Sequence, residues 1–147
     1  MILPRGVTGF WSVNAAPLPL LEEKAFCQMC YSIALENGGT VTELDTDTYP
    51  RNFYSAKLSR HDQSVFLLQN IHYPYAAFAQ RDTSGGFIWI SQPEWLQLPE
   101  GSVRFLSPSE LTRDWHDLCG ELAPEDLEQI CYWNPQTVGE IVFNTWD

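Results

Sequence analysis

The chain has 147 residues, of which 44% are hydrophobic and 14% are aromatic. That composition excludes intrinsic disorder, and the length predicts a single domain, residues 1–147, with a core of its own. Nineteen acidic residues against eight basic ones give a net charge of −11. Such a charge disfavours direct binding to nucleic acid or to anionic lipid.

Neither a membrane span nor a secretory signal is predicted. No apolar run approaches the roughly 18 residues that a membrane-spanning helix needs. Near the N-terminus, Asn14, Pro17 and Pro19 interrupt any signal-peptide core. We therefore expect a soluble cytoplasmic protein, whose four cysteines stay reduced in that compartment.

An extended arm, residues 1–18, precedes a long helix predicted over residues 19–37. Pro19 suits the first turn of a helix, and the pair Gly38-Gly39 ends it. Apolar side chains cover a wide arc of this helix, so we expect it to be largely buried.

Residues 40–106 are β-rich. The breaks between the apolar runs are mostly short and polar or glycine-rich, which favours antiparallel hairpins over parallel crossovers. An antiparallel meander of four to six strands is therefore predicted. The candidate strands are Thr40–Leu44, Asn52–Leu58, Ser64–Ile71, Tyr75–Gln80, Phe87–Ser91 and Val103–Leu106.

Residues 107–147 form an acidic helical segment with three short predicted helices. The run Ser107-Pro108-Ser109-Glu110 combines a capping box with a proline at the first helical position. Pro124 opens a second helix, and Asn134-Pro135 caps a third. The chain is therefore predicted to have an α+β fold, with one long N-terminal helix, the meander sheet and three short C-terminal helices.

Most of the negative charge lies in this last segment. Residues 1–104 hold ten acidic and seven basic residues, a net charge of −3. Residues 105–147 hold nine acidic residues and one basic residue, Arg113, a net charge of −8. In the helix after Ser107, acidic residues recur at steps of four, three and four, so their carboxylates point in nearly one direction. This acidic stripe consists of Glu110, Asp114, Asp117 and Glu121.

The stripe has three interpretations. The simplest is a solvated face that keeps the protein soluble. The second is a face that binds a basic partner, and the third is carboxylate catalysis or cation binding. Like charges at these spacings destabilise an isolated helix by roughly 0.2–0.5 kcal/mol per pair, and no basic residue on the stripe relieves them.

Large aromatic residues lie among the acids, a composition typical of binding hot spots. Trp115 and Phe143 are expected in the core. Trp133 and Trp146, which lie near helix ends beside polar residues, are candidates for exposed anchors. The predicted partner-binding residues are Glu110, Asp114, Asp117, Glu121, Glu125, Glu128, Trp133 and Trp146.

No metal or cofactor is predicted from the cysteines. Cys27 and Cys30 fall inside an apolar helix, whereas a redox dithiol needs its first sulfur at a helix N-terminus. Cys119 and Cys131 are too far apart in the sequence to be the second close pair of a zinc site. Buried structural thiols are the simpler interpretation.

The histidines do not predict a catalytic site either. His116 is adjacent to Asp117, but neighbouring side chains on a helix diverge by about 100°. His61-Asp62 fits a hairpin turn, and His72 precedes another bend. The chain contains no nucleophile elbow, phosphate loop, dinucleotide fingerprint or metalloprotease motif.

The closing run Tyr132-Trp133 through Val138-Gly139-Glu140-Ile141-Val142-Phe143-Asn144-Thr145-Trp146-Asp147 is similar to the C-terminal ends of small, uncharacterised bacterial proteins of toxin–immunity systems. The resemblance covers about sixteen residues and assigns no residue roles. It implies a cytosolic protein that protects its producer by holding a cognate toxin inactive.

The sequence thus leads to the hypothesis of a non-enzymatic inhibitor of the immunity type, which binds a basic protein through its acidic surface. If that partner is a nuclease toxin, the carboxylates would occupy the site that receives phosphates. Two alternatives are a small hydrolase-like enzyme that uses His116 and nearby carboxylates, and an adaptor or subunit of a larger assembly.

Overall fold

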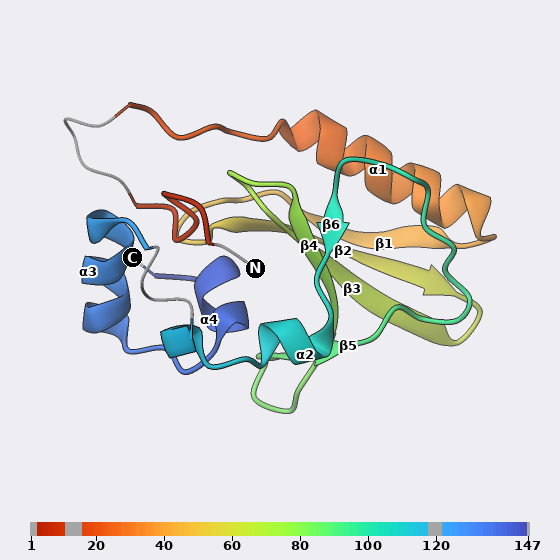
Figure 1. Cartoon of the computed structure of the whole chain (residues 1–147). Coiled ribbons are helices and arrows are strands. Elements are labelled where there is room, and N and C mark those ends of the chain that lie inside the picture. The colour runs from red at the N-terminus through yellow and green to blue at the C-terminus, as the bar shows by residue number, and fades with distance from the viewer. Residues whose placement is uncertain (1–2, 11–15, 118–121, 147) are drawn as a thin grey trace.

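Helices and strands follow one another in the order that the sequence predicts (Figure 1). The computed structural model describes residues 3–10, 16–117 and 122–146. The fold is α+β, with a long N-terminal helix, a mainly antiparallel sheet and three short C-terminal helices, as predicted. No helix in these ranges is long and apolar enough to cross a membrane. The elements are α1 (Glu23–Glu36), β1 (Thr40–Asp45), β2 (Phe53–Arg60), β3 (Gln63–Asn70), β4 (Tyr75–Arg81), β5 (Phe87–Ile90), β6 (Arg104–Phe105), α2 (Pro108–Leu111), α3 (Pro124–Trp133) and α4 (Val138–Val142).

The sheet has the order β1-β2-β3-β4-β5, and each neighbouring pair is antiparallel. His61-Asp62 is the two-residue turn between β2 and β3, as predicted, and His61 has a positive φ of 54°. The predicted meander of four to six strands is confirmed for β1 to β5, and β6, also predicted as a strand, lies outside it because it runs parallel to β4. Residues 91–103 connect β5 to β6 and reverse the direction of the chain before it pairs with β4 again.

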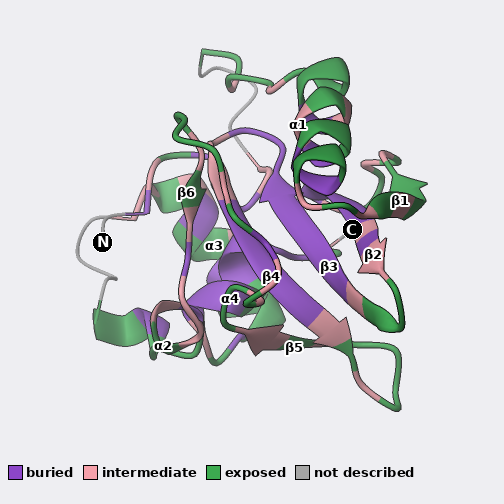
Figure 2. Ribbon diagram, turned by 90° about the vertical axis from the view of Figure 1, so that its right-hand side faces the viewer, coloured by how far each residue is buried: buried purple, intermediate pink, exposed green. Residues whose placement is uncertain are grey.

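Both faces of the sheet are buried. Along β3, Val65 and Leu67 belong to the core beneath α1, whereas Phe66 and Leu68 belong to the core shared with α2, α3 and α4. Figure 2 shows β3 buried along most of its length and β1 exposed at the edge. Because both faces are covered, β3 carries a continuous apolar run instead of alternating polar and apolar residues.

Helix α1 begins at Glu23 rather than at Pro19. The backbone before it is used in contacts with the sheet, since the Leu21 amide donates to the Ile71 carbonyl at 2.7 Å and the Tyr54 hydroxyl donates to the Leu21 carbonyl at 2.9 Å. The helix ends at Glu36, and Gly38, which has a positive φ of 72°, follows the C-cap Asn37, close to the predicted end. It buries one face only, so the expectation of a largely buried helix is wrong. Tyr31 and Leu35 are exposed.

The helix after Ser107 is much shorter than the acidic stripe requires. Ser107 forms the predicted capping box with Glu110, but α2 ends at Leu111. Beyond it the backbone of Asp114 forms an isolated antiparallel bridge with Thr137. Trp115 is buried, and its indole Nε1 donates to the Pro135 carbonyl at 2.9 Å. These contacts with the α3–α4 connection outweigh the helical pattern of the sequence.

Helix α3 starts at Pro124, as predicted, and ends at Trp133. Asn134 has a left-handed φ of 51° and caps the C-terminus of α3, so the prediction that it begins the next helix is wrong. The N-cap of α4 is Thr137, whose hydroxyl accepts a hydrogen bond from the Glu140 amide at 3.4 Å. Asparagine suits the αL position at a helix end, which explains the different assignment.

A buried polar network joins the N-terminal arm to the rest of the fold. Asn52 and Asn70 both donate from Nδ2 to the Val7 carbonyl, at 2.9 and 3.1 Å. Asn144 donates from Nδ2 to the Thr8 carbonyl at 3.0 Å, and its amide donates to Asn52 Oδ1 at 2.7 Å. All three asparagines are buried. The network links the arm to β2, to the end of β3 and to the end of α4.

We expect His72 to make stability depend on pH. Its Nδ1 lies 2.7 Å from the Pro19 carbonyl, which can only accept, so Nδ1 carries the proton. Burial lowers the pKa of His72 below its ordinary 6.5, although the Pro19 hydrogen bond and the charge of Asp126 act in the opposite direction. The unfolded chain therefore binds more protons than the native state once the pH falls below 6.5. The stability that depends on His72 should be fully present above pH 6.5 and should be lost as the pH falls toward the lowered pKa.

Urea unfolding of the wild type and of His72→Gln, at several pH values between about 7 and 5.5, measures this effect. The wild type should lose stability over this range, and the variant should lose less. His61→Asn, at an exposed turn residue, is the control and should keep the wild-type slope. Equal slopes in the wild type and His72→Gln would contradict the prediction.

Candidate functional site

The first three carboxylates of the predicted stripe lie beside basic side chains. Glu110 forms an ion pair with Arg104 and also completes the capping box of α2. Asp117 lies 3.4 Å from Arg113. Asp114 Oδ1 accepts a hydrogen bond from the His116 amide at 2.9 Å and lies 2.6 Å from His116 Nδ1, and these two contacts hold the pKa of Asp114 below its ordinary value.

These carboxylates therefore do not form an uncompensated helical stripe. The helix that would align them ends at Leu111. Arg104 and Arg113 screen two of them, and the pairing of Asp114 with His116 is local to one turn. The fourth stripe residue, Glu121, lies outside the described residues.

The two acids predicted on α3 have a different environment. Glu128 is exposed and Glu125 is half-buried. No basic side chain pairs with either of them in the part of the chain that the structure describes. Leu127 lies between these two acids in the sequence, and Tyr132 follows them. Both side chains are exposed, and Tyr132 is 76% exposed. These four residues, Glu125, Leu127, Glu128 and Tyr132, are here called the outer face of α3. This face combines carboxylates that have no basic partner with an apolar and an aromatic side chain.

Asp126, between these two acids, has the opposite role. It is fully buried on the inner side of α3. Its carboxylate accepts hydrogen bonds from the Gly6 amide at 2.8 Å, from the Thr8 amide at 3.3 Å and from the Thr8 hydroxyl at 2.5 Å. Sequence reasoning counted Asp126 with the surface charge, but this carboxylate fastens the N-terminal arm to α3.

The two predicted aromatic anchors are brought together. Trp133 and Trp146 stack with their planes 4° apart and their ring centroids 6.1 Å apart. Trp133 is 38% exposed and Trp146 is half-buried. Tyr132 lies edge-on to Trp133 with a centroid distance of 5.2 Å. Trp133 follows Asp126 and Ile130 on the inner side of α3, at the C-terminal end of the helix, and Tyr132 connects this aromatic stack to the outer face.

A cleft of about 540 Å³ lies beside the stack. Trp133 and Trp146 line it together with Arg51 and Arg81, which sequence reasoning did not select. Arg81 lies over the ring of Phe87 at 4.2 Å, and Arg51 forms an ion pair with Asp45 at 2.7 Å. The cleft itself is therefore not acidic. These arginines, Phe87 and the tryptophans come from distant parts of the sequence, so no local pattern could have grouped them.

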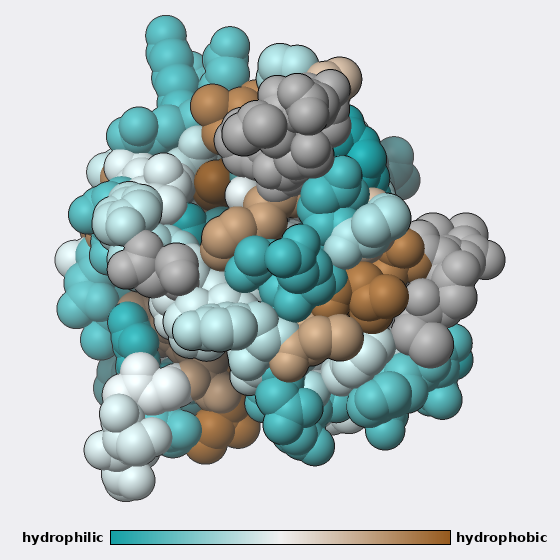
Figure 3. All heavy atoms as spheres, turned by 90° about the vertical axis from the view of Figure 1, so that its left-hand side faces the viewer, coloured by the Kyte–Doolittle hydropathy of each residue, from teal (hydrophilic) through white to brown (hydrophobic). Residues whose placement is uncertain are grey.

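Figure 3 shows the face of the molecule that includes α3. Small hydrophobic patches are interspersed with hydrophilic ones, and no continuous apolar area covers the face. Such a mosaic is compatible with a reversible protein interface but does not distinguish one, since these interfaces are about as apolar as the rest of the protein surface. Isolated charged groups at the rim of such a surface act mainly on encounter and specificity.

Among the described residues, the histidines and thiols do not lie together in one site. His116 is exposed, stacks on Trp115 with a centroid distance of 4.0 Å, and lines none of four cavities of about 780, 540, 430 and 200 Å³ in the described part of the chain. Burial raises the pKa of the Cys30 thiol to about 12 and also raises that of Cys27, to which Glu23 contributes. Such thiols stay protonated and are poor nucleophiles at neutral pH. Cys131 is exposed, and Cys119 lies outside the described ranges. No group of three or more potential metal ligands occurs in those ranges.

Comparisons of the chain with protein-family models, with curated protein sequences and with solved structures gave no match.

Proposed function

We propose that this chain is a non-enzymatic binding protein of the immunity type, which inhibits a basic protein such as a cognate toxin. The observation that carries the proposal is the outer face of α3 with the adjoining aromatic stack. Glu125 and Glu128 have no basic partner among the described residues, and Tyr132, on the same face of α3, contacts Trp133, which stacks on Trp146. A cation-rich partner complements this combination of charge and aromatic area.

The two kinds of residue have different tasks in the proposed interface. The carboxylates attract a basic surface and raise the association rate, an effect that salt screens over about 8 Å at physiological ionic strength. The tryptophans lose water-exposed apolar area on binding and slow dissociation. In this proposal the contact lies on α3 rather than on the region around α2, where Glu110 and Asp117 already form ion pairs with Arg104 and Arg113.

The test starts with affinity capture from the organism that encodes the chain. The bait is used as wild type, as Glu125→Lys/Glu128→Lys and as Trp133→Ala. A basic protein bound by the wild type is then purified, and its affinity for each form and its own activity are measured. We expect the charge reversal to weaken binding at least about tenfold and to flatten its salt dependence. Trp133→Ala should mainly raise the dissociation rate.

Matched controls separate this surface from overall charge. Glu36→Lys/Glu43→Lys makes the same change of net charge at exposed residues of α1 and β1, and Tyr31→Ala removes an exposed aromatic ring from α1. Both controls should bind as the wild type does. The proposal fails if the controls weaken binding as much as the α3 variants, or if the bound protein keeps its full activity in the complex.

A further inference from the structure

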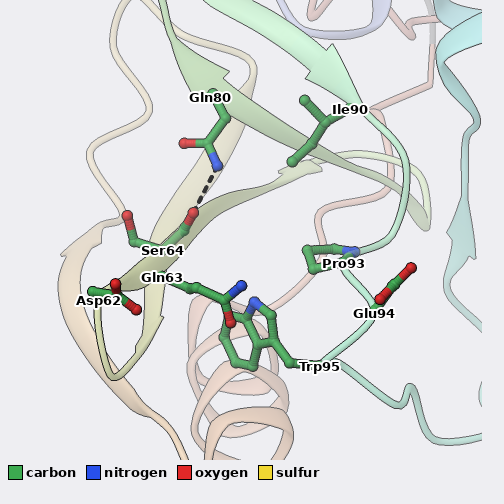
Figure 4. Close-up of a pocket in the computed structure, with 8 residues that line it drawn as sticks. All are labelled: Asp62, Gln63, Ser64, Gln80, Ile90, Pro93, Glu94 and Trp95. Carbon is green, nitrogen blue, oxygen red and sulfur yellow. Dashed lines mark hydrogen bonds between the residues drawn. The ribbon is translucent and has the colours of Figure 1, made fainter.

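A second hollow lies on the other side of the sheet from the aromatic stack. Its volume is about 780 Å³. Ile90 and Trp95, which line it, pack against the core beneath α1, whereas Trp146 packs against the opposite core. Figure 4 shows Trp95 on one side of the hollow, with Asp62 and Glu94 to either side of it. The lining residues are Asp62, Gln63, Ser64, Gln80, Ile90, Pro93, Glu94 and Trp95.

The segment that carries Trp95 is fixed in place by hydrogen bonds. Asn37, at the end of α1, accepts from the Gln97 amide at 2.8 Å and donates from Nδ2 to the Gln97 carbonyl at 3.0 Å. Gln92 Nε2 donates to the Leu96 carbonyl at 2.7 Å. A Cβ atom added at Gly39 would lie 3.4 Å from Trp95 Cζ3, so the ring packs closely on that backbone. The indole is therefore a preformed wall of the hollow.

The polar lining is rich in acceptors. Gln80 Nε2 donates to the Ser64 carbonyl at 2.6 Å, as drawn in Figure 4, which leaves Gln80 Oε1 as an acceptor. Asp62 and Glu94 add four carboxylate oxygens, which accept only. Sugars and other polyols need donors and acceptors in similar numbers, whereas ammonium and guanidinium groups donate only. Gln63, Ser64 and the Trp95 indole N–H add donors to the lining, so it is the two carboxylates, which accept only and carry charge, that favour a cation.

Charge and the aromatic wall point the same way. Neither Lys nor Arg is among the lining residues, and neither carboxylate has an ion-pair partner in the described part of the chain. An anionic ligand such as a phosphate ester would be repelled. Trp95 adds to this lining an indole, the aromatic ring that attracts cations most strongly.

We infer that the hollow lined by Asp62, Gln80, Glu94 and Trp95 binds an alkylammonium or guanidinium group. The group comes either from a lysine or arginine side chain of a peptide or from a free polyamine. This site is independent of the proposed function, since none of its residues belongs to α3 or to the aromatic stack.

The inference is tested by titrating the ¹⁵N-labelled chain and following the indole N–H signal of Trp95 by NMR. The probes are Nα-acetyl-arginine amide for a peptide side chain, spermidine for a free polyamine, Nα-acetyl-citrulline amide as the neutral isostere, and methyl glucoside as a polyol. We expect saturable shifts with one or both cations and at least about tenfold weaker binding of citrulline. The cation that binds more tightly identifies the source of the group.

Two double variants test whether the cations bind in this hollow. Asp62→Asn/Glu94→Gln removes both charges of the hollow with little change of shape and should weaken the cations about tenfold. Glu36→Gln/Glu43→Gln removes the same charge elsewhere and should leave their affinity unchanged. The inference is wrong if citrulline or methyl glucoside binds as well as the cations, if both double variants weaken binding equally, or if no probe gives a saturable shift.

Discussion

Asp126→Ala should lower the free energy of unfolding by about 3–4 kcal/mol, a large fraction of the roughly 5–15 kcal/mol that stabilises a domain. The fully buried carboxylate accepts three hydrogen bonds from the N-terminal arm. Removing it leaves the amides of Gly6 and Thr8 without this acceptor in a buried site, and each such loss costs about 1–3 kcal/mol. The same network holds Val7 in the core, so we expect the arm to loosen as well.

Urea unfolding followed by tryptophan fluorescence measures this loss. Asp126→Asn keeps one acceptor oxygen and should cost less than alanine. Glu125→Ala, one residue away on the same helix, is the control and should change stability by at most about 0.5 kcal/mol. If Asp126→Ala unfolds at the same urea concentration as Glu125→Ala, the carboxylate does not hold the arm.

Local patterns predicted most of the fold because each element carries its own signal. The apolar runs gave all six strands within one or two residues of the observed bounds. Ser107 and Pro124 correctly predicted the starts of two helices, since a cap or a proline acts on its own neighbours. The parallel pairing of β6 was missed because strand direction depends on the path of residues 91–103, which have no regular pattern.

The prediction of an acidic stripe was wrong because contacts with distant residues, and not the local pattern, decide the structure after Leu111. Its spacing is helical, but Trp115 reaches the Pro135 carbonyl and Asp114 bridges Thr137, and both partners lie about twenty residues further along the chain. Tertiary contacts of this kind override a weak local preference. The pairing of Glu110 with Arg104 was equally invisible, because the two side chains meet only through the turn between β6 and α2.

Buried polar residues were the least predictable part of the chain. Asp126 lies in the same acidic run as Glu125 and Glu128. Only the side of α3 on which each carboxylate lies distinguishes the buried Asp126 from the other two. Its partners, Gly6 and Thr8, lie almost at the other end of the sequence. Exposed carboxylates are the usual case, so a count of charges overstates the negative potential of the last segment. The aromatic stack was foreseen as two separate anchors, but not as one surface.

Gly139→Ala should also destabilise the protein, although alanine is the better helix former by about 1 kcal/mol. Gly139 lies in α4, where an added Cβ would be 2.6 Å from Trp89 Nε1 and 3.0 Å from the Leu111 carbonyl oxygen. The indole cannot move aside easily, because Trp89 packs on Phe87 and Phe143 with centroid distances of 6.5 and 5.3 Å. Overpacking of this kind costs about 1–3 kcal/mol, which exceeds the gain in helix propensity.

We therefore expect a net loss of about 1–2 kcal/mol for Gly139→Ala, measured as a lower urea midpoint with an unchanged m-value. Gly101→Ala is the matched control, because a Cβ at that exposed position meets nothing within 4 Å. It should be neutral or slightly stabilising, since alanine restricts the unfolded chain more than glycine does. Stabilisation by Gly139→Ala would mean that helix propensity outweighs the contact, and that α4 packs less closely on β5 and α2 than the distances indicate.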